Sequence, residues 1–116
     1  VAGVMREIAG RETQPAESVF ANVKIPWLGK TQARTFLAIM EIGYARALGV
    51  RCTYCHTERN FASDAKGPKL AAREMAVMHR MINVELGKMQ HIPTPANEDR
   101  AINCATCHRG ATRPLR

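Results

Sequence analysis

Aromatic side chains and long apolar runs are both scarce in this chain. Only 5% of its 116 residues are aromatic although 46% are hydrophobic, so a core would consist mainly of Ala, Leu, Ile and Met. A core of this composition and length is thin, which indicates that something other than side chains fills the centre of the fold. No apolar run approaches the ~18 residues of a membrane-spanning helix, and nothing reads as a strand. We therefore expect a mainly α-helical fold without a transmembrane segment.

Acidic residues are also in the minority, with 10 Asp and Glu against 17 Lys and Arg and a formal net charge of +7. This balance favours a partner with an acidic docking surface, a nucleic acid or an anionic membrane face, unless the charge serves only solubility or offsets the acidic groups of a cofactor. Nucleic-acid binding explains it poorly, because no arginine-rich helix or aromatic platform accompanies the basic residues. We therefore expect protein partners and no nucleic acid.

No cysteine stands outside two copies of one motif. The four cysteines form Cys-x-x-Cys-His at residues 52–56 and again at residues 104–108. This motif is the attachment signature of c-type haem. Its spacing places both sulfurs on one side of a helical turn, within reach of the two vinyl groups, and the next residue beneath the iron as an axial ligand. The sequence thus predicts two covalent haems, held by Cys52, Cys55 and His56 and by Cys104, Cys107 and His108.

Three other uses of paired cysteines compete with haem. A zinc ribbon usually separates its two pairs by about 15–20 residues, and the pairs here lie much further apart. Two disulfides would leave the histidine after each pair unexplained, and a thioredoxin-like dithiol normally occurs once, beside a βαβ pattern that is absent here. Covalent haem is the interpretation that uses every cysteine and both histidines.

The chain is expected to form one dihaem domain over residues 1–116. Residues 1–30 contain two prolines and no sustained helical stripe, and are expected to form an extended arm that wraps the rest. Residues 31–66 would form the unit of the first haem and residues 67–116 that of the second. The segment 88–100 holds two prolines and is predicted to be a loop.

Two helices are predicted from caps and periodicity. The first runs from about Thr31, as its N-cap, to Leu48, with Gly49 as its C-terminal stop. The second starts near Pro68, since proline is favoured in the first turn, and ends near Gly87. Each helix carries a methionine stripe and precedes one haem motif, which amounts to a loose internal repeat.

The sixth ligand of each iron must come from elsewhere in the chain. Met40 lies mid-helix on the face that leads to the first motif, so we expect it to ligate the first iron rather than only fill the core. For the second iron, Met75 lies centrally on its stripe, Met78 is displaced to one side, and His79 is also near the centre, so periodicity leaves all three open. His91 lies beside two prolines and is either a ligand or an exposed histidine.

The stretch 18–109 resembles the two-haem N-terminal half of the tetrahaem cytochrome c subunit of purple-bacterial photosynthetic reaction centres. The resemblance covers most of the chain, and its elements follow one another in the same order and at nearly the same spacing. The matching features, apart from the two haem motifs, are Asn22-Val23-Lys24, Phe36-Leu37 with Met40, Phe61-Ala62-Ser63-Asp64-Ala65-Lys66, Ala72-Arg73 with Met75 and Met78, Ile82-Asn83 and Arg109-Gly110.

The resemblance implies a small multihaem cytochrome c in which helices run alongside two covalently bound haems, with long loops between them. It assigns Met40 to the haem on Cys52 and Cys55, and Met75 rather than Met78 to the haem on Cys104 and Cys107. The family subunit carries four haems and has a histidine before its second motif that ligates a haem of the other half. His91 is its nearest match. With no second half here, we expect His91 to be free rather than to ligate a haem of a partner chain.

The expected function is electron transfer between redox proteins, without catalysis. The partners would carry acidic docking surfaces and include a reaction centre, another membrane-bound complex or further cytochrome chains. Haem attachment of this kind takes place outside the bacterial cytoplasm, so the chain is expected in the periplasm or outside the cell, with any membrane association through a partner or a removed anchor. The alternatives are a small dihaem peroxidase or reductase with one labile iron ligand, and a subunit of a longer haem wire.

Overall fold

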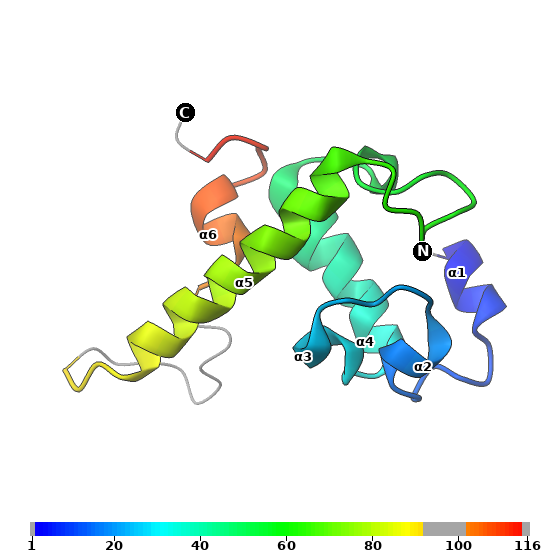
Figure 1. Cartoon of the computed structure of the whole chain (residues 1–116), viewed down its shortest axis with the longest axis horizontal. Coiled ribbons are helices and arrows are strands. Elements are labelled where there is room, and N and C mark those ends of the chain that lie inside the picture. The colour runs from blue at the N-terminus through cyan, green and yellow to red at the C-terminus, as the bar shows by residue number, and fades with distance from the viewer. Residues whose placement is uncertain (1, 92–101, 115–116) are drawn as a thin grey trace.

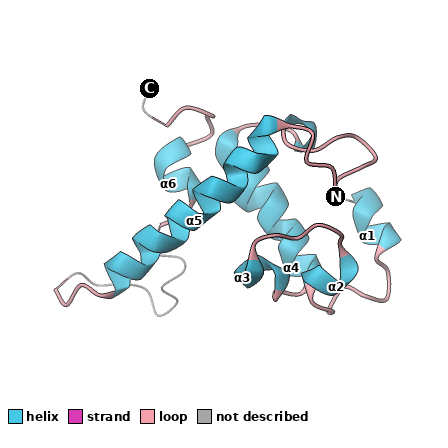
Figure 2. Cartoon of the chain, in the orientation of Figure 1, coloured by secondary structure: helices cyan, strands magenta, loops and turns pink. Residues whose placement is uncertain are grey.

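The computed structural model describes residues 2–91 and 102–114, and within these ranges every regular element is helical, as the sequence predicts (Figure 2). Within the same ranges, no helix is long and apolar enough to cross a membrane. In chain order, the elements are α1 (Ala2–Glu7), α2 (Ala16–Val19), α3 (Pro26–Gly29), α4 (Ala33–Ala38), the π-helix η1 (Ile39–Arg46), the 3-10 turn η2 (Cys52–Tyr54), α5 (Gly67–Gly87) and α6 (Cys104–His108).

The N-terminal arm is not extended, which corrects the expectation from the sequence. It contains α1, α2 and α3, which gather at one end of the molecule around α4 (Figure 1). Pro15 precedes α2 at its N-cap and Pro26 opens α3, where the fixed φ of proline suits the first helical turn. Because α2 and α3 have only four residues each, they are too short to leave a periodic apolar stripe in the sequence.

Backbone hydrogen bonds attach this arm to the start of α4. The N–H of Ala16 donates to the carbonyl of Thr31 at 2.8 Å, and the N–H of Ala33 donates to the carbonyl of Gln14 at 2.8 Å. Behind this contact, Ile8, Ala33 and Leu37 form a small buried cluster. The arm is therefore bound to the first long helix by both its backbone and its apolar side chains.

The first long helix agrees with the predicted range 31–48 but differs in its start and its geometry. It begins at Ala33 with Gln32 as N-cap, while the Thr31 hydroxyl donates instead to the carbonyl of Leu28 at 2.6 Å. At Ile39 the helix passes from α into π geometry, which was not predicted. The helix ends before Gly49, whose φ of +69° fits the predicted stop. Segments of π-helix are rare and frequently accompany functional sites.

Helix α5 spans Gly67–Gly87, in agreement with the predicted second helix. In Figure 1 it crosses in front of the first long helix and extends away from the cluster of short helices. Its middle is attached to α3, since the Arg80 guanidinium lies 4.8 Å above the Trp27 ring. Most of the predicted loop 88–100 lies outside the described residues.

A close backbone contact joins the end of the first long helix to the segment after α6. The N–H of Gly110 donates to the carbonyl of Ala47 at 2.8 Å. A Cβ atom on Gly49 would lie 2.1 Å from the Gly110 carbonyl oxygen, so only glycine allows this approach. The contact fixes α6 against the helix that precedes the first Cys-x-x-Cys-His motif.

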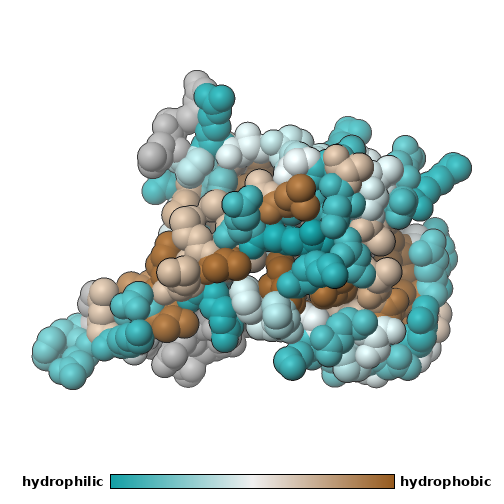
Figure 3. Space-filling view, viewed as in Figure 1, coloured by the Kyte–Doolittle hydropathy of each residue, from teal (hydrophilic) through white to brown (hydrophobic). Residues whose placement is uncertain are grey.

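The side-chain core is small, as the composition predicts. Among the described residues, the buried hydrophobic ones are only Ile8, Ala16, Ala33, Leu37, Ala47 and Ala76. Many large apolar side chains of α5 remain exposed, Met81 by 64%, and apolar surface is visible along α5 and in the hollow beside it (Figure 3). Exposed apolar area of this extent indicates a surface that another group covers.

Candidate haem-binding site

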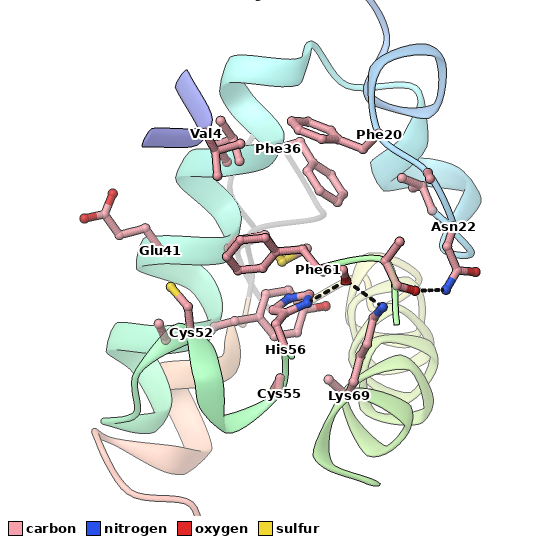
Figure 4. Close-up of a pocket in the computed structure, with 18 of the residues that line it drawn as sticks. Val4, Phe20, Asn22, Phe36, Glu41, Cys52, Cys55, His56, Phe61 and Lys69 are labelled. Carbon is pink, nitrogen blue, oxygen red and sulfur yellow. Dashed lines mark hydrogen bonds between the residues drawn. The ribbon is translucent and has the colours of Figure 1, made fainter. Parts of the chain in front are cut away.

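A cavity of about 440 Å³ lies between the first long helix, the first Cys-x-x-Cys-His motif and α5 (Figure 4). Its lining includes all four residues that the sequence assigns to the first haem, Met40, Cys52, Cys55 and His56. Met40 comes from the π-helix, and the other three come from η2 and the residues directly after it. Thiols, an imidazole and a thioether therefore surround one partly apolar space, the donor set that a c-type haem needs.

The imidazole of His56 is oriented by the loop that follows it. Its Nδ1 lies 2.9 Å from the carbonyl oxygen of Phe61, and the two rings meet edge to face with centroids 5.2 Å apart. Because only a protonated Nδ1 can donate to that carbonyl, Nε2 is left as the free ligating nitrogen. Burial is the main cause that lowers the pKa of His56, and the charges of Lys69 and Arg73 add to it. The neutral, ligating form of the ring is therefore favoured.

A cluster of polar residues from three segments forms another wall of the cavity, and the sequence did not predict that these residues gather there. The ammonium group of Lys69 contacts the carbonyls of Phe61 and Ser63 at 2.9 and 2.8 Å and the carboxylate of Asp64 at 3.2 Å. Arg73 pairs with the same carboxylate at 2.9 Å, and Asn22 of the arm donates to it at 2.8 Å. The hydrogen bond from Arg73, followed by those from Lys69 and Asn22, lowers the pKa of Asp64 to about 2 against a weaker opposing effect of burial.

Tyr44, on the same helix as Met40, is a further residue of the cavity that the sequence did not single out. Its ring lines the cavity. Burial raises its pKa to about 12, and the neighbouring Cys104 and Cys55 act in the same direction. Tyr44 therefore lies in the same cavity wall as Cys52 and Cys55 of the first motif.

The second motif is a short helix with its own cap. Asn103 precedes α6 as its N-cap. Its side-chain oxygen accepts a hydrogen bond from the N–H of Thr106 at 3.1 Å, and its own N–H donates to the Thr106 hydroxyl at 3.0 Å. After the helix, Nδ1 of His108 lies 2.9 Å from the carbonyl of Ala111. His108 therefore has the same anchored Nδ1 and free Nε2 as His56.

Helix α5 holds the chain directly before the second motif. Nε2 of His79 donates to the carbonyl of Ile102 at 2.7 Å, and the buried Asn83 accepts from the N–H of Ile102 at 2.9 Å. His79, one of the candidate ligands, thus has a structural partner at Nε2. Met75 and Met78 are 40% and 45% exposed on the same helix, so both thioethers are accessible for ligation.

The geometry also bears on the alternatives to haem. All four cysteines are free of disulfides in this structure. A zinc ribbon would require both cysteine pairs to converge, whereas nowhere in residues 2–91 and 102–114 do three His, Cys, Asp or Glu side chains gather as a metal site. The separate cysteine pairs, each followed by a histidine with a free Nε2, fit covalent haem.

The helical fold, the thin core and the two attachment motifs are typical of a c-type cytochrome. The chain matches the family model of the photosynthetic reaction centre cytochrome C subunit over residues 2–116, and it belongs to this family. The family implies covalently attached haem c, which the donor set around the cavity fits.

Two curated relatives support this membership. Cytochrome c-554 of Chloroflexus aurantiacus is 42% identical over 69 residues, which cover 60% of this chain and 16% of the relative. The photosynthetic reaction center cytochrome c subunit of Rubrivivax gelatinosus is 38% identical over 80 residues, which cover 62% of this chain and 22% of the relative. The chain therefore matches only a sixth to about a fifth of the length of these relatives.

Proposed function

We propose that this chain binds two haem c groups in one domain and passes single electrons between redox partner proteins. The observation that carries the proposal is the shared geometry of His56 and His108, each with Nδ1 on a backbone carbonyl and Nε2 free. When bound, haem supplies a one-electron iron couple. The protein's own contribution is to fix both groups, exclude water and set their potentials.

The first haem would be held by Cys52 and Cys55, with His56 and Met40 as axial ligands. These four residues line one cavity, which supports the assignment. Phe61 packs its ring against His56 and restricts the rotation of the imidazole. Thioether ligation raises the reduction potential of a haem relative to bis-histidine ligation, so Met40 would give the first haem a higher potential than a second histidine ligand would.

The second haem would be held by Cys104 and Cys107, with His108 and Met75 as axial ligands. The sequence resemblance to the family subunit favours Met75 over Met78, and the contact of His79 with the carbonyl of Ile102 argues against histidine ligation from α5. His91 is exposed and would remain free. On this assignment residues 31–66 carry the first haem and residues 67–116 the second.

We further propose that the partners are redox proteins with acidic docking surfaces, such as a reaction centre or another membrane-bound complex outside the bacterial cytoplasm. The net charge of +7 supports this class of partner. The relative from Rubrivivax gelatinosus is named as a reaction center subunit, which is the source of that specific candidate.

Intact-mass analysis and a far-red spectrum of the natively matured protein test the proposal. The expected mass is that of the polypeptide plus two haems, and the ferric spectrum should show a methionine–iron charge-transfer band of two-haem intensity. Half that intensity would implicate His79 or His91 at one iron. A bare polypeptide, or a polypeptide with zinc, would refute the proposal.

Carbon monoxide binding separates the electron carrier from a dihaem enzyme. With both irons six-coordinate, the ferrous protein should not bind carbon monoxide rapidly. A Met40→Ala variant serves as the positive control, because loss of the thioether opens one position for the gas. Rapid binding by the unmodified protein would instead favour an enzyme with a labile ligand.

A further inference from the structure

One backbone carbonyl in the cavity wall accepts two hydrogen bonds. The oxygen of Phe61 receives Nδ1–H of His56 at 2.9 Å and the ammonium group of Lys69 at 2.9 Å. Figure 4 shows both dashed lines converging on this oxygen, one from each side chain. A carbonyl has two lone pairs, so both donors are accommodated at once.

The second donor changes the strength of the first bond. An ammonium group withdraws electron density from the carbonyl oxygen, which makes that oxygen a weaker acceptor for Nδ1–H of His56. A weaker bond at Nδ1 reduces the basicity of the imidazole as an iron ligand. Less basic ligands favour the ferrous over the ferric state, and a nearby cation acts in the same direction.

Lys69 is held firmly enough for this effect to persist. Its residue is only 9% exposed, and its ammonium group is fixed by the carbonyl of Ser63 at 2.8 Å and the carboxylate of Asp64 at 3.2 Å. The side chain projects from α5, the longest helix of the described chain, so its position does not depend on the loop alone. Three oxygen partners leave the ammonium little freedom to leave the Phe61 carbonyl.

The described residues around the second motif show one such bond and no second donor to its carbonyl. Nδ1 of His108 donates to the carbonyl of Ala111, which belongs to an exposed residue. Within residues 2–91 and 102–114, no lysine or arginine side chain is bonded to that oxygen. Both histidines therefore donate from Nδ1 to a backbone carbonyl, but among the described contacts only the carbonyl of Phe61 also accepts from a lysine.

We propose that Lys69 is a positioning residue that weakens the bond from His56 to the Phe61 carbonyl and thereby makes the first haem easier to reduce than it would be without this contact. The proposal rests on the proposed function, since it needs a haem ligated by His56. The relevant electrons are supplied and withdrawn one at a time by the redox partners.

The test is a mediated redox titration of the holoprotein and its Lys69→Met variant, with the two haems resolved spectrally. In the variant, the reduced-to-oxidised ratio of the first haem at a fixed potential should fall by on the order of tenfold, which corresponds to about 59 mV for one electron. The second haem should move by much less. An unchanged first haem, or an equal shift of both haems, would overturn the proposal.

Arg73→Met is the matched control for charge. Arg73 also lines the cavity and lies near enough to act on the pKa of His56, but its guanidinium bonds to Asp64 and to the carbonyl of Asn22 instead of that of Phe61. It should therefore shift the first haem less than Lys69→Met does. Equal shifts in the two variants would show that charge alone acts and would overturn the hydrogen-bond argument.

A measurement on the unmodified ferrous protein keeps the proposal testable if Lys69→Met fails to mature. The ¹⁵N shift of Nδ1 reports the strength of its hydrogen bond, and it should indicate a weaker bond for His56 than for His108. The reverse order would overturn the proposal. Both experiments begin with a protein whose mass shows two attached haems. Absence of haem would refute the proposed function, whereas a dihaem protein without the expected Lys69 effect would refute only this further proposal.

Discussion

Replacement of Asn83 by alanine tests how the second attachment motif is held in place. Asn83 is 2% exposed, and its side chain accepts from the N–H of Ile102 at 2.9 Å and donates to the carbonyl of Ile102 at 3.2 Å. Both bonds join α5 to the residue that lies two positions before Cys104. No other described side chain contacts that N–H, so the alanine variant leaves a backbone donor without its partner.

The cost follows from the hydrogen bonds that are lost. Each contributes about 1 kcal/mol net, and an unsatisfied buried donor costs about 1–3 kcal/mol, so Asn83→Ala should lower the free energy of unfolding by about 2–4 kcal/mol. The remaining bond from His79 to the carbonyl of Ile102 at 2.7 Å keeps the loss toward the lower end of this range. Urea unfolding of the holoprotein, followed by far-ultraviolet circular dichroism, measures the change.

Glu85→Ala provides the matched control on the same helix. Its carboxylate pairs with Lys88 at 3.1 Å, and both side chains are 67% exposed. Such a pair contributes at most about 0.5 kcal/mol, so this variant should unfold almost as the unmodified protein does. If Asn83→Ala were no more destabilising than Glu85→Ala, the contact would not hold the second motif and the reasoning would be refuted.

Three further outcomes are expected from the described contacts. Gly49→Ala should destabilise the protein far more than Gly10→Ala. Both glycines have positive φ, which costs an alanine about 1–2 kcal/mol at either position, but only at Gly49 would the new Cβ meet a backbone oxygen at 2.1 Å. Equal urea midpoints for the two variants would contradict this. The partners of the Asp64 carboxyl, first the Arg73 guanidinium and then the Lys69 ammonium group, lower its pKa to about 2. The carboxylate should therefore keep its charge as the pH falls through the usual carboxyl range, and it should lose the charge and its contribution to stability only near pH 2. A carboxyl ¹³C titration midpoint near 4 would show that these pairs do not form in solution. Leu37→Ala should cost about 2–4 kcal/mol because Leu37 is buried in the small apolar cluster, whereas Met81→Ala, at 64% exposure, should cost far less in the same urea experiment.

The long helices could be predicted because their signals are local. Pro68 at the start, glycine at the end and a stripe of apolar residues between them give the bounds of α5 within one residue. The π geometry of the helix around Met40 could not be predicted in this way. An i, i+4 stripe such as Met40 and Tyr44 fits an α-helix and a π-helix alike, so apolar spacing does not separate the two.

The cavity residues likewise divide into those that local sequence spacing predicts and those whose role depends on tertiary contacts. The cysteines and histidines of the motifs are read directly from their spacing, and the structure adds the orientation of the rings. Lys69 could not be found from the sequence, because its role depends on which carbonyl the loop 61–64 turns toward it. His79 shows the converse case, since periodicity made it a candidate ligand whereas its Nε2 bonds to the backbone before the second motif.

One helix connects the two attachment motifs. It carries Met40 and, one turn later, Tyr44 on the wall of the cavity beside the first motif. At its end, the carbonyl of Ala47 accepts a hydrogen bond from the N–H of Gly110, and Gly49 packs against the carbonyl of Gly110, two residues after the second motif. A displacement of this helix would therefore move a wall of the first site and the support of the second together. Under the proposed dihaem function, attachment of both motifs to the same helix would fix the separation of the two centres.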